Sequence, residues 1–129
     1  MSGWIWLDPQ ALLAAHDEQL AEHGGASGIR DQGLFDSALT RPQDLAAGGN
    51  PDAAALAAAY AMGLAKRHLF ISGRRRIAPI ALEAFLGLNG LELVVDDSRW
   101  VFIALALSSG DIGEAVLAQW IRQHMRARA

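Results

Sequence analysis

The chain has 129 residues, no cysteine and a formal net charge of −3. This length predicts one domain over residues 1–129 that can bury a core of its own. The absence of cysteine excludes disulfides, thiolate metal sites and a cysteine nucleophile, and the acidic balance argues against nucleic-acid binding. No secretory signal and no apolar run of about 18 residues is visible, so we expect a cytoplasmic protein without a membrane span.

The first quarter of the chain predicts a short apolar segment followed by a helix. Residues 4–7 are expected to be strand-like and to pack on the domain. Asp8 and Pro9 have the residue types of an N-cap and a first helical position. Apolar residues at helical spacing then predict a helix over 9–22, which the glycine pair at 24–25 ends.

A glycine-rich loop and a short second helix come next. Residues 24–33 contain four glycines, which favours special backbone angles over a helix. The second helix is expected to begin near Asp31 and to end at Pro42, because proline lacks the amide proton that a helix needs. Residues 43–51 then form a connector.

The centre of the chain predicts two buried helices. Residues 52–69 are rich in alanine and apolar on all sides, which is typical of a helix with close neighbours. A second helix over 74–88 must begin at the arginines, because Pro79 is tolerated only in or near a first turn. The remaining segments are an extended stretch at 91–97, a helix at 100–107 and a last helix capped by Asp111, whose end carries Arg122, His124, Arg126 and Arg128. The sum is an all-α fold of about six helices with a central pair.

The loop between the two central helices is where the positive charge gathers. Five of the eleven Lys and Arg residues fall within residues 66–76, a stretch that contains no acid. Helix-start amides have no intrahelical partners, the helix dipole adds positive potential, and Gly73 lets a ligand approach the backbone. Arg74, Arg75 and Arg76 add further donors, so a small anion such as phosphate is the expected ligand. His68 could then accept a proton from a hydroxyl that attacks the phosphate.

A purely structural interpretation of the same residues stays open. A histidine at a helix end is often a capping residue, and a run of arginines is often a solvated face. Three cations at the positive end of a helix are nevertheless unfavourable unless an anion compensates them.

Residues 68–76 read His-Leu-Phe-Ile-Ser-Gly-Arg-Arg-Arg. This resembles the Fic/Doc family signature His-x-Phe-x-Asp/Asn-Gly/Ala-Asn-Lys-Arg. The resemblance to the Doc (death-on-curing) branch continues in four flanking segments: 13–17, 23–34, 37–42 and 85–90. It implies a compact, six-helix Fic/Doc-type bundle.

The resemblance also implies roles for individual residues. His68 would be the general base toward a target-protein hydroxyl, Gly73 would form the phosphate cradle, and Arg76 would bind nucleotide phosphate. Phe70 would point inward and anchor the loop. At Arg75 the Doc branch has lysine, whereas AMP-transferring members usually have glycine, so a bulky cation favours phosphate transfer.

The implied function is that of a toxin of a toxin–antitoxin pair. Such a protein transfers the terminal phosphate of ATP, or of another nucleotide, to translation elongation factor Tu or another protein. A Phd-like antitoxin would neutralise it. The glycine-rich loop would be the flap where the target docks, through Gly24, Gly25, Gly28, Arg30 and Asp31.

Two positions depart from the family signature. Ser72 replaces the acidic or amide residue that holds magnesium, and serine is a poor lone ligand for that ion. Arg74 replaces an asparagine near the phosphates. We therefore expect weak or absent dependence on Mg²⁺. A catalytically degenerate domain that only binds nucleotide or a partner, and a transferase with another donor or target, remain alternatives.

Overall fold

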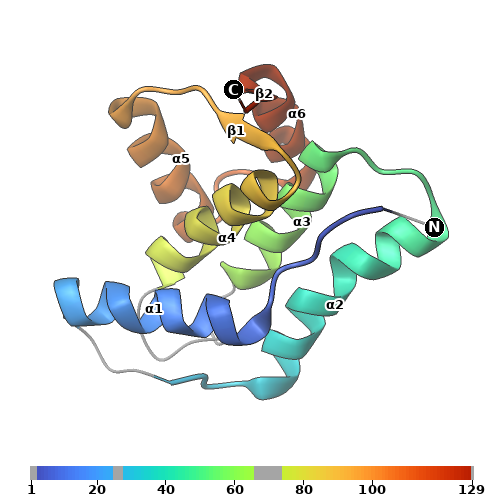
Figure 1. The fold of residues 1–129 in the computed structure, drawn as a ribbon. Coiled ribbons are helices and arrows are strands. Elements are labelled where there is room, and N and C mark those ends of the chain that lie inside the picture. Colours follow the sequence, from blue (N-terminus) through green and yellow to red (C-terminus); the bar gives the residue numbers. More distant parts are fainter. Residues whose placement is uncertain (1–2, 25–27, 66–73, 129) are drawn as a thin grey trace.

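The computed structural model describes the backbone of residues 3–24, 28–65 and 74–128, and their side chains other than those at 23, 74–76 and 108. Within these ranges the chain forms six helices and one small sheet (Figure 1). The helices are α1 (Pro9–His23), α2 (Gln32–Gly48), α3 (Ala53–Leu64), α4 (Arg74–Leu88), α5 (Asp97–Ser109) and α6 (Glu114–His124). The predicted all-α bundle of six helices is confirmed.

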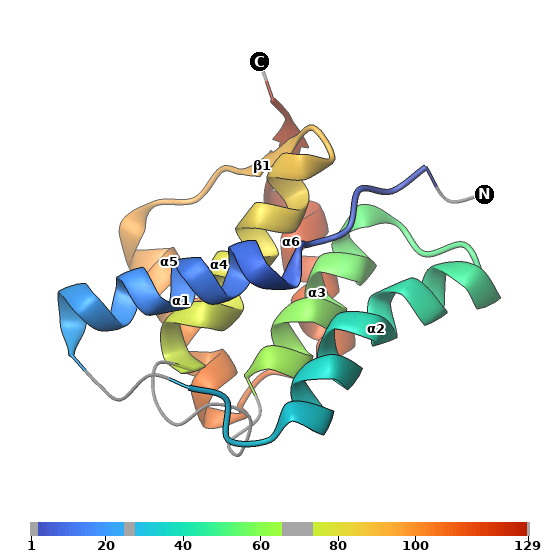
Figure 2. The same cartoon turned by 60° about the horizontal axis from the view of Figure 1, so that its bottom comes forward.

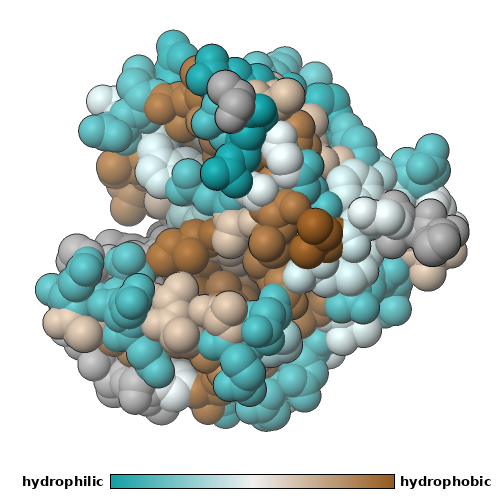
Figure 3. Space-filling view, viewed as in Figure 1, coloured by the Kyte–Doolittle hydropathy of each residue, from teal (hydrophilic) through white to brown (hydrophobic). Residues whose placement is uncertain are grey.

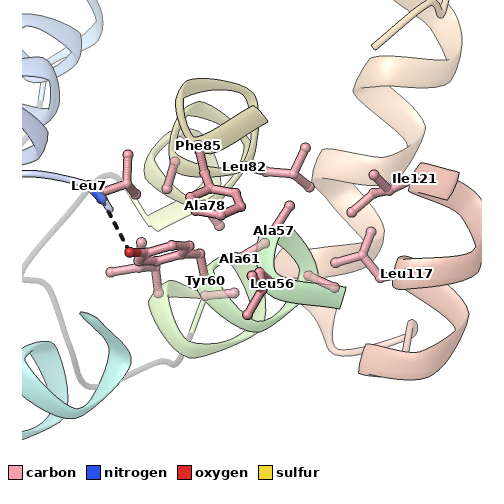
Figure 4. Close-up of a cluster of buried hydrophobic side chains, with 14 of the residues drawn as sticks. Leu7, Leu56, Ala57, Tyr60, Ala61, Ala78, Leu82, Phe85, Leu117 and Ile121 are labelled. Carbon is pink, nitrogen blue, oxygen red and sulfur yellow. Dashed lines mark hydrogen bonds between the residues drawn. The ribbon is translucent and has the colours of Figure 1, made fainter. Parts of the chain in front are cut away.

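The core is built around α3 and α4, as predicted. α2 and α6 pack on α3, whereas α1 and α5 pack on α4. The alanines of α3 let these neighbours come close. A Cβ on Gly63 would lie 2.9 Å from the Cβ of Ala38 in α2, so only glycine fits there. Figure 4 shows Phe85 and Leu82 of α4 meeting Tyr60 and Leu56 of α3 in this core.

Aspartates begin four of the helices. Asp8, Asp31, Asp52 and Asp96 each accept a hydrogen bond from a backbone amide of the first turn that follows, which satisfies one of the free amides there. Asp52 is also held by Arg122 of α6, and the hydrogen bond from that guanidinium is the main reason why the pKa of Asp52 is lowered.

The C-terminal helices begin and end elsewhere than predicted. α5 begins at Asp97, three residues before the expected start, because Asp96 caps it. The predicted cap of α6, Asp111, is not the cap; it accepts a hydrogen bond from Ser109 instead, and Gly113 is the N-cap. α5 ends at Gly110, which has φ +80°. The chain changes direction over the next residues, so α6 begins only after Gly113. α3 ends at Leu64 rather than near Leu69.

The prolines do not act as their local chemistry predicts. α2 continues through Pro42 to Gly48, so the prediction of a helix end at Pro42 and a connector over 43–51 was wrong for residues 43–48. Pro42 is buried in the same face as Phe35, Ala38 and Leu39. We infer that packing of this face offsets the lost hydrogen bond. Pro79 lies beyond the first turn of α4, although that helix does begin at the arginines.

The two ends of the described chain lie against the end of α4. β1 (Leu91–Leu93) pairs antiparallel with β2 (Met125–Ala127), so Arg126 belongs to a strand and not to the last helix. The segment at 4–7 is extended but is not a strand; its amides bind side chains instead. The Ile5 amide donates to Asn89 Oδ1 at 2.9 Å, and the Leu7 amide donates to the Tyr60 hydroxyl at 3.2 Å.

Candidate functional site

The candidate site lies where α3 ends and α4 begins. Ala65 caps α3 and Arg74 is the first residue of α4, so the motif joins the two central helices. In Figure 2 these two helix ends and residues 28–31 lie on the same side of the molecule. The fold therefore places the predicted flap region and the predicted phosphate-binding end of α4 on the same side of the molecule.

Part of the predicted site lies outside the described residues. This holds for His68, Phe70, Ser72, Gly73 and for Gly25 of the flap. Their predicted roles remain predictions. Arg74, Arg75 and Arg76 form the first turn of α4 by their backbone.

The start of α4 is a strongly positive helix end. Its first turn contains three arginines and no acidic residue. The first amides of a helix have no partners within it, and the dipole places partial positive charge at the same point. Together these features suit an anion with several oxygens, such as a nucleotide phosphate. That turn contains no carboxylate, the side chain that magnesium prefers.

The helices behind this end are fixed by the core. Ile77, Ala78 and Ala81 of α4 are buried, as are Leu64 and Ala65 at the end of α3. Because packed helices hold the start of α4 in place, a site at this position would keep its geometry when a ligand binds.

The described flap residues have backbone roles that the sequence pattern only partly foretold. Gly24 ends α1 with φ +82° and donates its amide to the Leu20 carbonyl at 2.8 Å. Gly28 has φ +123°, a conformation that favours glycine. Asp31 caps α2 through a 3.0 Å bond from the Leu34 amide, and Arg30 is exposed. Asp31 therefore has a structural task beside the docking role predicted for it.

Arg41 lies in the segment that resembles the family, and the structure gives it a partner that the sequence did not reveal. Its guanidinium donates two hydrogen bonds to the Glu114 carboxylate, at 2.5 and 2.8 Å. This hydrogen bonding is the main reason why the pKa of Arg41 is raised. The pair ties α2 to the start of α6. It forms one wall of a hollow of about 590 Å³ that also reaches Met62 and Gly63, near the end of α3.

An apolar groove runs between the N-terminal segment, α1 and α4. Its volume is about 640 Å³, and its lining includes Ile5, Ala11, Ala84 and Leu88. Figure 3 shows a band of apolar surface across the middle of the molecule, above α1. The groove was not predicted from the sequence, because three segments far apart in the chain line it. The only local signal was the small or apolar residues at helical spacing on the exposed sides of α1 and α4.

Two features are absent from residues 3–24, 28–65 and 74–128. In that part of the chain no group of three or more His, Asp or Glu side chains is placed to hold a metal ion. None of the helices described there is both long and apolar enough to cross a membrane.

Comparison with known proteins agrees with the geometry. The profile of the Fic/DOC family matches residues 6–86. "Protein kinase doc" of Escherichia phage P1 is 26% identical over 118 residues, which cover 91% of this chain and 93% of that protein. "Toxin Doc" of Mycolicibacterium smegmatis is 39% identical over 93 residues, which cover 70% of this chain and 69% of that protein. The chain therefore belongs to the Fic/DOC family.

Proposed function

We propose that this protein is a Doc-like toxin of a toxin–antitoxin system that transfers a nucleotide phosphate to a hydroxyl of a target protein. The observation that carries the proposal is the start of α4, where the three arginines that end the family motif occupy the first turn of the helix, whose amides have no partners within it. The names of the two relatives, one a toxin and one a protein kinase, support the same activity. Elongation factor Tu, or another protein of its class, is the proposed target, and ATP is the proposed donor.

The proposed reaction is an in-line phosphoryl transfer. His68 takes the proton of the target hydroxyl, and the resulting oxygen attacks the terminal phosphorus of ATP. The bond between that phosphorus and the bridging oxygen breaks, which leaves ADP and a phosphorylated target. Arg76 and the first amides of α4 stabilise the charge on the transferred group, as electrostatic catalysis of this reaction requires.

Magnesium is expected to matter little in this reaction. Ser72 offers a weak ligand, and the first turn of α4 contains no carboxylate. The guanidinium of Arg74 would supply fixed positive charge that a metal ion supplies in other phosphoryl transfers.

The proposed antitoxin is a Phd-like protein with an apolar segment that fits the groove between α1 and α4. The supporting observation is the apolar lining from Ile5 to Leu88. Ala84→Asp places a charge in this groove and should weaken capture of a co-expressed antitoxin at least tenfold, since burying an unpaired carboxylate is costly. Ala47→Asp, on an exposed residue of α2 outside the groove, is the control and should leave capture unchanged.

One assay tests the transfer reaction. The protein is incubated with elongation factor Tu and with ATP labelled on either the α or the γ phosphate, with and without magnesium, beside a His68→Ala variant. We expect label from the γ phosphate only, little dependence on magnesium, and no label with His68→Ala. Label from the α phosphate would show AMP transfer instead, and transfer that survives His68→Ala would refute the assigned base.

The second candidate function is binding of nucleotide or partner without transfer. Ser72 and Arg74 favour it, because both occupy positions where the family signature has other residues. Calorimetry with ATP, beside the transfer assay, separates the two functions: both bind ATP, but a degenerate domain transfers nothing to any target. If activity is absent, the double change Ser72→Asp and Arg74→Asn should create magnesium-dependent transfer, and a variant that stays inactive would place the defect elsewhere.

A further inference from the structure

A small hollow lies where α1, α4 and α5 meet. α1 and α5 both pack on α4, and the hollow between the three helices has a volume of about 240 Å³. Much of its wall is apolar and comes from Pro79, Ile80, Val101 and Ala104. Sites for small organic ligands usually measure roughly 300–1,000 Å³. This hollow therefore has room for one long side chain rather than for a nucleotide.

Three polar or aromatic side chains complete the hollow: Gln19 of α1, Glu83 of α4 and Trp100 of α5. We call it the Glu83 hollow. Glu83 can be reached from solvent, but its partly apolar surroundings raise the pKa of its carboxyl, and no cation in the described part of the chain acts against this. A carboxylate in such surroundings is stabilised most by a cation from outside.

The lining selects a particular kind of cation. Lys and Arg side chains combine an apolar stem with a charged head. The stem would lie along the apolar wall, and the head would donate a charge-assisted hydrogen bond to the Glu83 carboxylate. The Gln19 amide oxygen can accept a further hydrogen bond, and the Trp100 ring attracts cations. An uncharged or acidic side chain would leave Glu83 uncompensated.

The Glu83 hollow continues the apolar groove between α1 and α4. Ile80 lines both of them. Ile80, Glu83, Ala84 and Gly87 follow one another at the spacing of a single helix face. Arg128 lines the groove beside the C-terminal end of α4, where its guanidinium donates to the Gly87 carbonyl. The groove and the hollow together thus have a cation at one end and a carboxylate at the other.

We propose that the Glu83 hollow is a subsite for a Lys or Arg side chain of the peptide segment that occupies the groove between α1 and α4. The basic residue enters the hollow and pairs with Glu83, while the positive charge of Arg128 favours an acidic group at the other end of the segment. The two charges therefore set the direction in which the segment binds. That this segment belongs to an antitoxin rests on the proposed function; the cation subsite does not.

A small probe tests the subsite without any partner protein. Butylguanidinium, which has the shape of an Arg side chain, is titrated into the full chain, and NMR follows the Trp100 indole N–H and the Gln19 side-chain amide. We expect both signals to shift and to saturate in the millimolar range, because one side chain alone binds weakly. Butylurea, which is similar in shape but uncharged, should shift them far less, and Glu83→Gln should remove the response to butylguanidinium. No response in the native chain, or an unchanged response in Glu83→Gln, would overturn the subsite.

Capture of a co-expressed Phd-like antitoxin tests the assigned occupant. Glu83→Lys should weaken capture about tenfold or more, because it sets two cations against each other, and Glu83→Gln should weaken it less. The matched control is Asp44→Lys, which makes the same change of charge at an exposed residue of α2 outside both the groove and the hollow. It should leave capture unchanged. Circular dichroism confirms that each variant is folded.

Charge reversal in the antitoxin makes this test specific. Changing each Lys or Arg of its bound segment to Glu in turn should yield one variant that restores capture by the Glu83→Lys protein. Capture by Glu83→Lys that equals that of the native chain would refute the proposal. If the native chain captures no antitoxin, the proposed antitoxin partner is wrong, and the butylguanidinium titration still decides whether the subsite exists.

Discussion

The two ends of α4 are held in opposite ways. At its C-terminal end Asn89 donates to the carbonyls of Phe85 and Ile5 at 2.9 and 3.0 Å and accepts from the Ile5 amide. Arg128 donates to the carbonyls of Gly87 and, through its amide, of Gly90. At the N-terminal end the first turn is three arginines with no acid.

Under the proposed function, this contrast separates stability from ligand binding along one helix. The C-terminal end has its polar groups paired within the protein, which fixes the helix. The N-terminal end places three arginines at the positive end of the helix dipole, at a cost in stability that the rest of the helix offsets; under the proposed function a phosphate would compensate these charges. Substitutions at the two ends should therefore change the free energy of unfolding in opposite directions.

The largest effect is expected at Phe85. Its ring is fully buried and lies 5.2 Å from that of Tyr60, 5.9 Å from Trp6 and 6.0 Å from Trp4. Phe85→Ala should lower the free energy of unfolding by ~3–5 kcal/mol in urea titrations, because it leaves a cavity at the C-terminal end of α4. The control Leu88→Ala, at a side chain that is 44% exposed, should cost far less. Similar losses for both would contradict the tight packing of this end.

Asn89→Ala should have the next largest effect. It removes the amide group that joins α4 to the N-terminal segment and should cost ~1–3 kcal/mol. Hydrogen exchange of the Ile5 amide should become faster, since it loses its acceptor. Asn50→Ala, at an exposed asparagine, serves as control. Unchanged exchange at Ile5 would mean that Asn89 does not hold the segment.

Tyr60→Phe should cost ~0.5–1.5 kcal/mol at neutral pH, because the Leu7 amide loses the hydroxyl that accepts from it. Burial also raises the pKa of Tyr60. The folded state therefore favours the protonated hydroxyl, a contribution that is present at neutral pH and lost as pH rises through the raised pKa. The difference between native protein and Tyr60→Phe should thus shrink above about pH 10. A difference that stays constant in alkaline urea titrations would contradict this.

The smallest effect, and the only one of opposite sign, is expected at the other end of α4. Arg75→Glu replaces a cation by an anion at a helix start and should raise the free energy of unfolding by ~0.3–1 kcal/mol. Binding of ATP should fall at the same time, which calorimetry can measure. Arg99→Glu, in the first turn of α5 and away from the motif, is the control: it should also stabilise slightly but leave ATP binding intact. A lower free energy of unfolding for Arg75→Glu would contradict the proposed contrast between the two ends of α4.

Local chemistry was enough to predict much of this fold. Asp8, Asp31 and Asp52 cap helices where their residue types indicated, and α4 has the predicted bounds of 74–88. These features depend on neighbours within a few residues, such as a carboxylate and the amides that follow it. The run of arginines at the start of α4 and the motif that indicates the family are also local, because each lies within a few consecutive residues. Both could therefore be identified from the sequence.

Only the tertiary structure decided the features that depend on distant neighbours. Pro42 breaks the local rule because its face of α2 is buried against α3, and Arg41 is fixed by a glutamate 73 positions away. The sheet of residues 91–93 with 125–127, the groove between α1 and α4, and the hollow between α5 and α6 are equally non-local. Helix caps and turns are determined by contacts along the chain, whereas grooves and ion pairs arise only when folding brings separate segments together.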